Sequence, residues 1–185
     1  MHATIPTPTV LVVAPADASP ALVEAVEGEG IQVRSATPDE LDGALTEAAV
    51  DVVVVVSGPE GLAAVARVAR TTPATRYLAV ADDLDPAAAL DAGIGGVVAA
   101  SAPPDVVRSA VRGLALGEGF LDAPLAREVL ERHRREGIAL TATEEEVLGR
   151  LARGDAAATI ADDYAVTARL VRLHAGGALS RLLPT

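Results

Sequence analysis

Two spacings of hydrophobic side chains alternate along the first 120 residues. Short runs of β-branched residues, typical of strands, alternate with segments whose apolar residues recur every three or four positions, typical of amphipathic helices. Five consecutive valines at 52–56 indicate a strand that is buried on both faces of a parallel sheet. The pattern predicts five strands, at Thr9–Val13, Ile31–Arg34, Asp51–Val56, Arg76–Ala81 and Gly96–Ala99. It predicts a helix after each strand, at Ala21–Glu27, Pro38–Ala48, Glu60–Arg70, Pro86–Ala92 and Pro103–Leu116.

Five strand–helix repeats in succession favour an α/β fold, because neighbouring parallel strands need a crossover helix between them. The expected architecture is a flavodoxin-like (βα)5 domain with a doubly wound parallel sheet. The pattern changes after Asp122, where Pro124–Glu136 is a polar helix rich in Arg and Glu that we interpret as a linker. We therefore expect an α/β domain at 1–120, a linker helix at 121–138 and a small all-helical domain at 139–185.

The C-terminal segment predicts three helices. Thr141-x-x-Glu144 is a capping box that opens a helix at Ala142–Arg153. A second helix follows at Ala156–Tyr164, and Thr167 caps a third helix that runs to about Leu182. A short helix, a tight turn and a following helix are typical of a helix-turn-helix motif.

Composition narrows the classes of function. The 185 residues include 26 acidic residues, 15 arginines and no lysine, which gives a net charge of −11. Such a chain is neither a general nucleic-acid coat nor a binder of anionic membranes. The absence of cysteine excludes disulfides and thiol nucleophiles, and three scattered histidines predict neither a metal site nor a cofactor. With no signal-type leader and no long apolar stretch, we expect a cytoplasmic protein without a membrane partner.

The three parts differ in charge. Residues 1–122 carry −11, residues 123–138 carry +1 and residues 139–185 carry −1. The all-helical segment is therefore near neutral rather than basic, which argues mildly against tight binding to DNA.

Several C-terminal motifs point to a known family. Leu140–Leu148 resembles the L-T-P-R-E-x-E-V-L opening of the NarL/LuxR-type helix-turn-helix domain, and Ile160-Ala161 and Val166–His174 match its later motifs. The match runs without a gap over more than 40 residues. The whole chain thus resembles a two-domain response regulator of this type, with a receiver domain followed by a DNA-binding domain.

This resemblance implies a DNA interface on the third helix of the motif. The positions that would face the bases in the major groove are Arg172, Leu173 and Gly176, and those near the backbone are Thr167 and Arg169. An arginine can bond guanine O6 and N7 together, so Arg172 is the candidate base reader. The alternative is that both arginines are ordinary exposed helix residues. His174 is equally well explained as a packed helix residue.

The N-terminal domain resembles a receiver but departs from it at the positions that carry out phosphorylation. Ala14-Pro15 replace the acidic pair, Val56 the phosphoacceptor Asp, Ala81 the Ser or Thr, Ala100 the Lys and Val97 the aromatic switch residue. Phosphoryl transfer to a carboxylate needs that carboxylate, acidic ligands for Mg²⁺ and a cation. We therefore predict a pseudo-receiver without aspartyl phosphorylation. The nearby polar residues Asp17, Ser57, Asp82 and Asp83 are interpreted as loop or turn residues rather than replacements.

Two features weaken the DNA interpretation. Gly176-Gly177 lie inside the expected recognition helix, where each glycine costs about 1 kcal/mol relative to alanine. The resembled domain has a fourth helix, which we expect to be missing because the sequence stops at Pro184-Thr185. The receiver-like domain, a second copy or another protein would then have to cover the apolar residues Leu148, Leu151, Leu179 and Leu183.

Three functions remain for comparison with the structure. The leading hypothesis is a phosphorylation-independent transcription regulator that binds double-stranded DNA as a homodimer. The first alternative is a protein-interaction module, a homodimer or heterodimer whose degenerate helix-turn-helix no longer binds DNA. The second is a small-molecule sensor that uses the vacated pocket around Ala14, Val56, Ala81 and Ala100. An enzyme is the least favoured class, because no nucleophile–base pair or carboxylate pair stands at a strand end.

Overall fold

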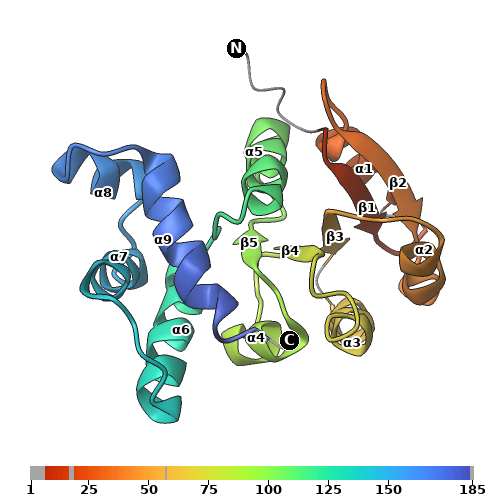
Figure 1. Cartoon of the computed structure of the whole chain (residues 1–185). Helices are drawn as coiled ribbons and strands as arrows, with labels where there is room; N and C mark the ends of the chain where they lie inside the picture. Colours follow the sequence, from red (N-terminus) through yellow and green to blue (C-terminus); the bar gives the residue numbers. More distant parts are fainter. Residues whose placement is uncertain (1–6, 17–18, 57, 184–185) are drawn as a thin grey trace.

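A computed structural model describes residues 7–16, 19–56 and 58–183 of the chain (Figure 1). Its centre is a parallel sheet with the strand order β2-β1-β3-β4-β5. This order confirms the predicted flavodoxin-like arrangement. The strands are β1 (Thr9–Val13), β2 (Gln32–Ala36), β3 (Val52–Val56), β4 (Arg76–Val80) and β5 (Gly96–Val98).

Helices cover both faces of the sheet, so the valines of β3 are divided between two cores. Val53 and Val55 pack in one core with residues of α2, α3 and α4, whereas Val52 and Val54 pack in the other with residues of α1 and α5. This division explains why β3 is apolar throughout rather than alternating. The helices are α1 (Ser19–Val26), α2 (Leu41–Glu47), α3 (Pro59–Val68), α4 (Pro86–Ala92) and α5 (Pro104–Ala115).

Two element boundaries differ from the expected ones at the edge of the sheet. β2 ends at Ala36 rather than Arg34, because an exposed edge strand keeps its backbone pairing without an apolar pattern. α2 begins at Leu41 rather than Pro38. The carboxylate of Glu40 accepts hydrogen bonds from the backbone N–H and the hydroxyl of Thr37, each at 2.9 Å, and holds 37–40 as a turn.

The predicted linker helix is a core element of the fold. α6 (Ala123–Glu136) buries Leu125, Ala126, Val129 and Leu130 in the same hydrophobic cluster as Leu90 of α4 and Leu148 of α7. Figure 1 shows α6 between α4 and α7 (Ala142–Ala152), with α8 (Ala157–Asp163) farther from the sheet and α9 (Ala168–Ser180) running past α6 toward α4. One continuous core therefore runs from the sheet into the helix-turn-helix.

This core also covers the leucines that were expected to need a partner. Leu148, Leu151 and Leu179 are buried, and Leu183 packs partly buried against the same cluster. In this structure the cover comes from the same chain, through α6 and the receiver-like domain. In the described part of the chain, the helices are all too short or too polar to cross a membrane.

Because the core is continuous, we expect residues on both sides of α6 to unfold together. Leu148→Ala, which empties a fully buried site in α7, should cost about 2–5 kcal/mol and shift the whole thermal transition. Differential scanning calorimetry measures this as one peak with equal calorimetric and van't Hoff enthalpies. Two peaks, of which the substitution moves only one, would contradict it. The domain boundaries near residues 120 and 138 stay a prediction that the same experiment addresses.

Candidate nucleic-acid interface

The residues predicted to form a vacated phosphorylation site lie at the carboxyl ends of their strands. Ala14-Pro15 follow β1, Val56 ends β3, Ala81 follows β4 and Ala100 lies two residues after β5. Their side chains offer neither a carboxylate nor a cation. Asp17 and Ser57, the two nearest polar residues considered from the sequence, lie outside the described residues. Within the described ranges, no group of three histidines or acidic residues is arranged to hold a metal ion.

Asp82 has a structural contact at this edge. Its carboxylate accepts a hydrogen bond of 2.9 Å from the backbone N–H of Ala100. This bond ties the loop after β4 to the loop after β5, between the residue next to Ala81 and Ala100 itself. Asp83 is exposed, in keeping with the sequence interpretation of a solvated loop acid.

The hollow beside Ala14 is displaced from the other vacated positions. It has a volume of about 420 Å³ and is lined by Ala14, Ser35, Thr37 and Glu40 among others, on the β1–β2 side of the sheet. Val56, Ala81 and Ala100 are not among its lining residues. A small-molecule site at the vacated position therefore stays a prediction.

The helix-turn-helix is built by side-chain caps at the helix starts and a tight turn between the last two helices. Thr141 and Glu144 form the predicted capping box of α7, and the hydroxyl of Thr167 accepts the N–H of Leu170 at the start of α9. Between α8 and α9, Ala165 adopts a left-handed backbone with φ of 52°. The three helices bury a common set of residues, Val147, Leu148, Leu151, Ile160, Ala161, Val171, Ala175, Ala178 and Leu179.

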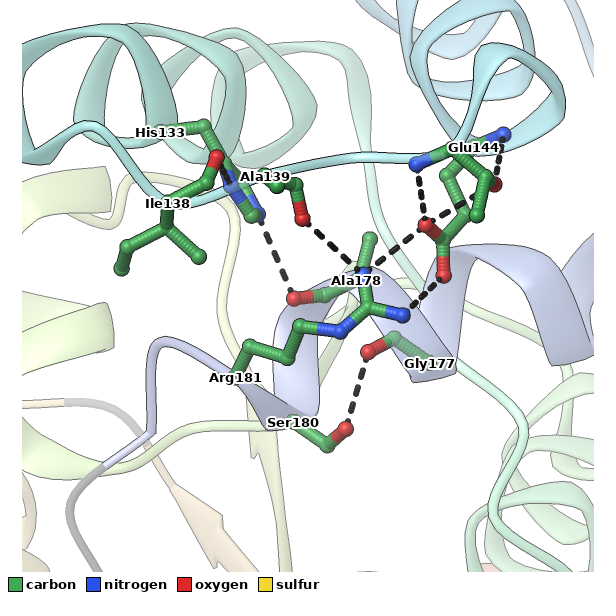
Figure 2. A network of polar contacts seen from close by, with 9 residues as sticks. His133, Ile138, Ala139, Glu144, Gly177, Ala178, Ser180 and Arg181 are labelled. Carbon is green, nitrogen blue, oxygen red and sulfur yellow. Dashed lines mark hydrogen bonds and ion pairs between the residues drawn. The ribbon is translucent and has the colours of Figure 1, made fainter.

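An ion pair closes the helix-turn-helix at its C-terminal end (Figure 2). Arg181 donates to both carboxylate oxygens of Glu144, at 2.8 and 2.9 Å. The backbone N–H and the hydroxyl of Thr141 donate to the same carboxylate. The bonds from Arg181, assisted by those from Thr141, hold the pKa of Glu144 at about 2, although its burial opposes this shift. The sequence predicted the cap but not the arginine, which lies 37 residues away.

His133 of α6 extends this network toward the sheet. Its ring is buried, with Nδ1 2.9 Å from the carbonyl oxygen of Ile138 and Nε2 3.3 Å from that of Ala178 in α9 (Figure 2). A neutral imidazole has one N–H and donates to one of these oxygens, whereas an imidazolium donates to both. The ring therefore connects α6 directly to the end of α9.

The candidate reading helix is docked on the receiver-like domain. Glu118, in the loop after α5, is buried and receives two arginines of α9. Its Oε2 lies 2.6 Å from Nε of Arg172, and its Oε1 lies 3.2 Å from Nε of Arg169. The guanidinium of Arg172 also lies over the ring of Phe120, 5.1 Å from the ring centre.

Two glycines allow this docking. The backbone N–H of Gly119 donates to the carbonyl of Arg172 at 2.8 Å. A methyl group on Gly176 would lie 2.8 Å from the nitrogen of Gly119, and one on Gly119 would lie 2.7 Å from the nitrogen of Gly176. Neither position can carry a side chain unless the helix and the loop separate. The glycine that looked costly within the helix therefore permits a backbone contact.

The structure brings together three of the five candidate DNA residues. Arg169, Arg172 and Gly176 all meet the loop at 117–120, whereas Thr167 caps α9 and Leu173 is exposed. Arg172 is half-buried in this conformation, whereas Arg169 remains exposed although it pairs with Glu118, as the alternative interpretation supposed for both. Arg172 and Gly176 are turned toward the protein rather than toward a DNA groove.

Sequence reasoning missed the residues on the receiver side of this contact. Glu118, Gly119 and Phe120 lie in a segment that was interpreted only as the end of the first domain. The carbonyl of Phe120 accepts the N–H of Val97, which fixes the segment beside β5. The signal available in the sequence was the pair Gly176-Gly177 inside a helix. Glycine lowers the stability of a helix, so its presence there indicates that another backbone approaches closely.

Solved structures with the same fold are response regulators. A structure of two RcsB dimers bound to two parallel DNAs matches with a TM-score of 0.55 and 20% identity, over 95% of this chain and 92% of that chain. A LuxR family DNA-binding response regulator from Silicibacter pomeroyi matches with a TM-score of 0.52 and 26% identity, over 62% of this chain and 96% of that chain. The response regulator ChrA of a heme-sensing two-component system matches with a TM-score of 0.51 and 22% identity, over 91% and 86%.

No family model and no curated protein matches the sequence. The likeness to the solved structures nevertheless shows that the chain has the fold of DNA-binding response regulators, an α/β receiver fold followed by a helix-turn-helix. The resemblance expected from the sequence motifs is confirmed at this level.

Glu144→Gln should lower the free energy of unfolding at neutral pH by about 1.5–3 kcal/mol, the range for hydrogen bonds to charged groups. The pKa of Glu144 falls from 4.5 to about 2 on folding, so its stabilisation is complete above pH 4.5 and is lost as the pH falls toward 2. The difference between the two chains should therefore shrink across this window. Urea unfolding at pH values from about 3 to 7 measures it. Glu145→Gln, at an exposed neighbour, is the control, and a difference independent of pH would contradict the assignment.

Proposed function

We propose that this chain is a transcription regulator that binds double-stranded DNA through α9 and does not use aspartyl phosphorylation as its signal. The observation that carries the proposal is the helix-turn-helix frame, in which Thr167 caps α9 and Arg169 and Arg172 project on the side of Gly176. The same fold occurs in RcsB, which has been captured on DNA.

In the proposed complex the two arginines have different tasks. Arg172, near the middle of α9, reads a guanine through its O6 and N7 atoms, with Leu173 and Gly176 beside it. Arg169 and the capped start of the helix at Thr167 contact phosphates and fix the register. A homodimer would place two such helices on half-sites about one helical turn apart.

Binding of this kind requires a released form of α9. Glu118 holds both arginines in the conformation described here, so a duplex has to displace the loop at 117–120 before it meets them. The apparent affinity is then reduced by the fraction of molecules in which the loop is released. A ligand, a partner protein or a second copy that favours release would act as the signal in place of phosphorylation.

The paired arginines favour a second candidate function, a protein-interaction module that does not bind DNA. Of the five arginines at 139–185, Arg150, Arg169, Arg172 and Arg181 form ion pairs within the chain. Salt-dependent binding to DNA requires cations that are free to neutralise phosphates. The two functions differ in whether a released α9 binds DNA.

We expect Gly119→Ala to increase duplex affinity about tenfold or more, because the new methyl group would collide with Gly176 and release α9. Both the original chain and the variant would be incubated at low salt with a random double-stranded library, and the retained sequences read. Adding Arg172→Ala to the variant should remove the gain. Gly43→Ala, at a helical glycine with open space around it, is the matched control.

The outcome separates the two functions. An enriched palindrome would support a dimeric regulator and give the spacing of its half-sites. No enrichment by a Gly119→Ala chain that circular dichroism shows to be folded would overturn the DNA proposal and favour the interaction module.

A separate prediction concerns phosphorylation. Incubation with acetyl phosphate and Mg²⁺ should leave the intact mass unchanged, because Val56 offers no carboxylate and Ala14-Pro15 offer no metal ligand. Beryllofluoride should likewise leave duplex affinity unchanged. An aspartyl phosphate found by mass spectrometry would contradict this part of the proposal without touching DNA binding.

A further inference from the structure

A second surface of the helix-turn-helix remains open when α9 is docked. It is a groove between α7, α8 and the first half of α9, lined by Glu146, Ile160, Tyr164, Val166, Leu170 and His174 among others. We call it the α8–α9 groove. Figure 1 shows α8 and the beginning of α9 on the side of the molecule away from the sheet, so the receiver-like domain does not cover it.

The α8–α9 groove is bordered by exposed apolar side chains. Six large hydrophobic residues are exposed in the described part of the chain, and three of them, Tyr164, Val166 and Leu170, lie within seven residues at this groove. Their exposed fractions are 39–46%. A contiguous apolar patch with a polar rim is typical of a surface that contacts another molecule.

The size of the groove favours a side chain over a free small molecule. Its volume is about 210 Å³. Pockets for small-molecule ligands usually measure roughly 300–1,000 Å³. A groove of this size accommodates one or two large side chains projecting from a partner protein.

The charge around the groove selects the kind of partner. Residues 142–166 hold six acidic residues and two arginines, and with Arg181, which pairs with Glu144, they carry a net charge of −3. Glu146 lines the groove and its carboxylate accepts a hydrogen bond from the hydroxyl of Tyr164, whereas Arg150 is paired with Asp155 and Asp163. Glu146 is the acidic residue among the described residues that line the groove, and neither an arginine nor a lysine is among them.

This charge disfavours two other occupants. A DNA duplex is an anion and would meet Glu146 in the groove. A second copy of the chain carries the same Glu146 and a net charge of −11, so two such grooves facing each other would repel.

We infer that the α8–α9 groove is a docking site for a basic segment of a partner protein, one that presents a large aliphatic or aromatic side chain flanked by Arg or Lys. The apolar side chain enters between Tyr164, Val166 and Leu170, and a flanking cation meets Glu146. The groove is lined by residues other than those of the proposed DNA contact, which are Thr167, Arg169, Arg172, Leu173 and Gly176.

A peptide selection tests the inference on the full chain. A random peptide library displayed on phage would be selected against the immobilised protein, and the affinity of synthesised winners measured by fluorescence anisotropy. We expect winners with a large apolar residue flanked by Lys or Arg. Leu170→Asn and Glu146→Lys should each weaken them about tenfold or more, as truncation of a central anchor does. Leu116→Asn, at a similarly exposed leucine after α5, should leave binding unchanged.

The inference would be overturned if no peptide with basic and apolar residues were selected. It would also be overturned if the selected peptides bound the Leu170→Asn chain as tightly as the original. A dimer that dissociates on Leu170→Asn in sedimentation would make a second copy the occupant. Duplex binding that is lost on Leu170→Asn and unaffected by the peptides would assign the groove to DNA.

Discussion

The close contact between α9 and the loop at 117–119 sets the arrangement of this protein. Gly119 and Gly176 meet backbone to backbone, and neither tolerates even a methyl group. At that separation the N–H of Gly119 reaches the carbonyl of Arg172, and the buried carboxylate of Glu118 reaches two guanidinium groups. A buried carboxylate without these partners would carry a large desolvation penalty, so the ion pairs and the glycine contact depend on each other.

The rest of the helix-turn-helix is held in place around this contact. The apolar residues of α6 pack in one cluster with those of α4 and α7, so α6 fixes the position of the C-terminal helices relative to the sheet. At the far end of α9, Arg181 closes on Glu144, and His133 reaches the carbonyl of Ala178. α9 is therefore fixed at its middle by the receiver-like domain and at its end by α6 and α7.

These contacts change which charged side chains are free to bind a partner. Arginines that a DNA-binding helix would point outward are bound to Glu118, and another is bound to Asp155 and Asp163. What remains outward on the α8 side is acidic and apolar. The same helix thus has two different sides, one that is docked on Glu118 and one that is open in the docked form.

The sequence by itself determined the strand–helix repeats, the strand order, the helix caps at Thr141 and Thr167, and the absence of a carboxylate or a cation at Ala14, Val56, Ala81 and Ala100. These follow from local periodicity, from turn and cap residues and from the identity of single side chains, which are all readable along the chain. Only the tertiary structure decided the environment of Arg172, the burial of Glu118, the partner of Glu144 and the reason for Gly176. Each of these joins residues far apart in sequence, such as Glu118 and Arg172 across 54 positions. A contact between distant backbones leaves no periodic pattern, and an arginine has the same letter whether it faces a phosphate or a buried carboxylate.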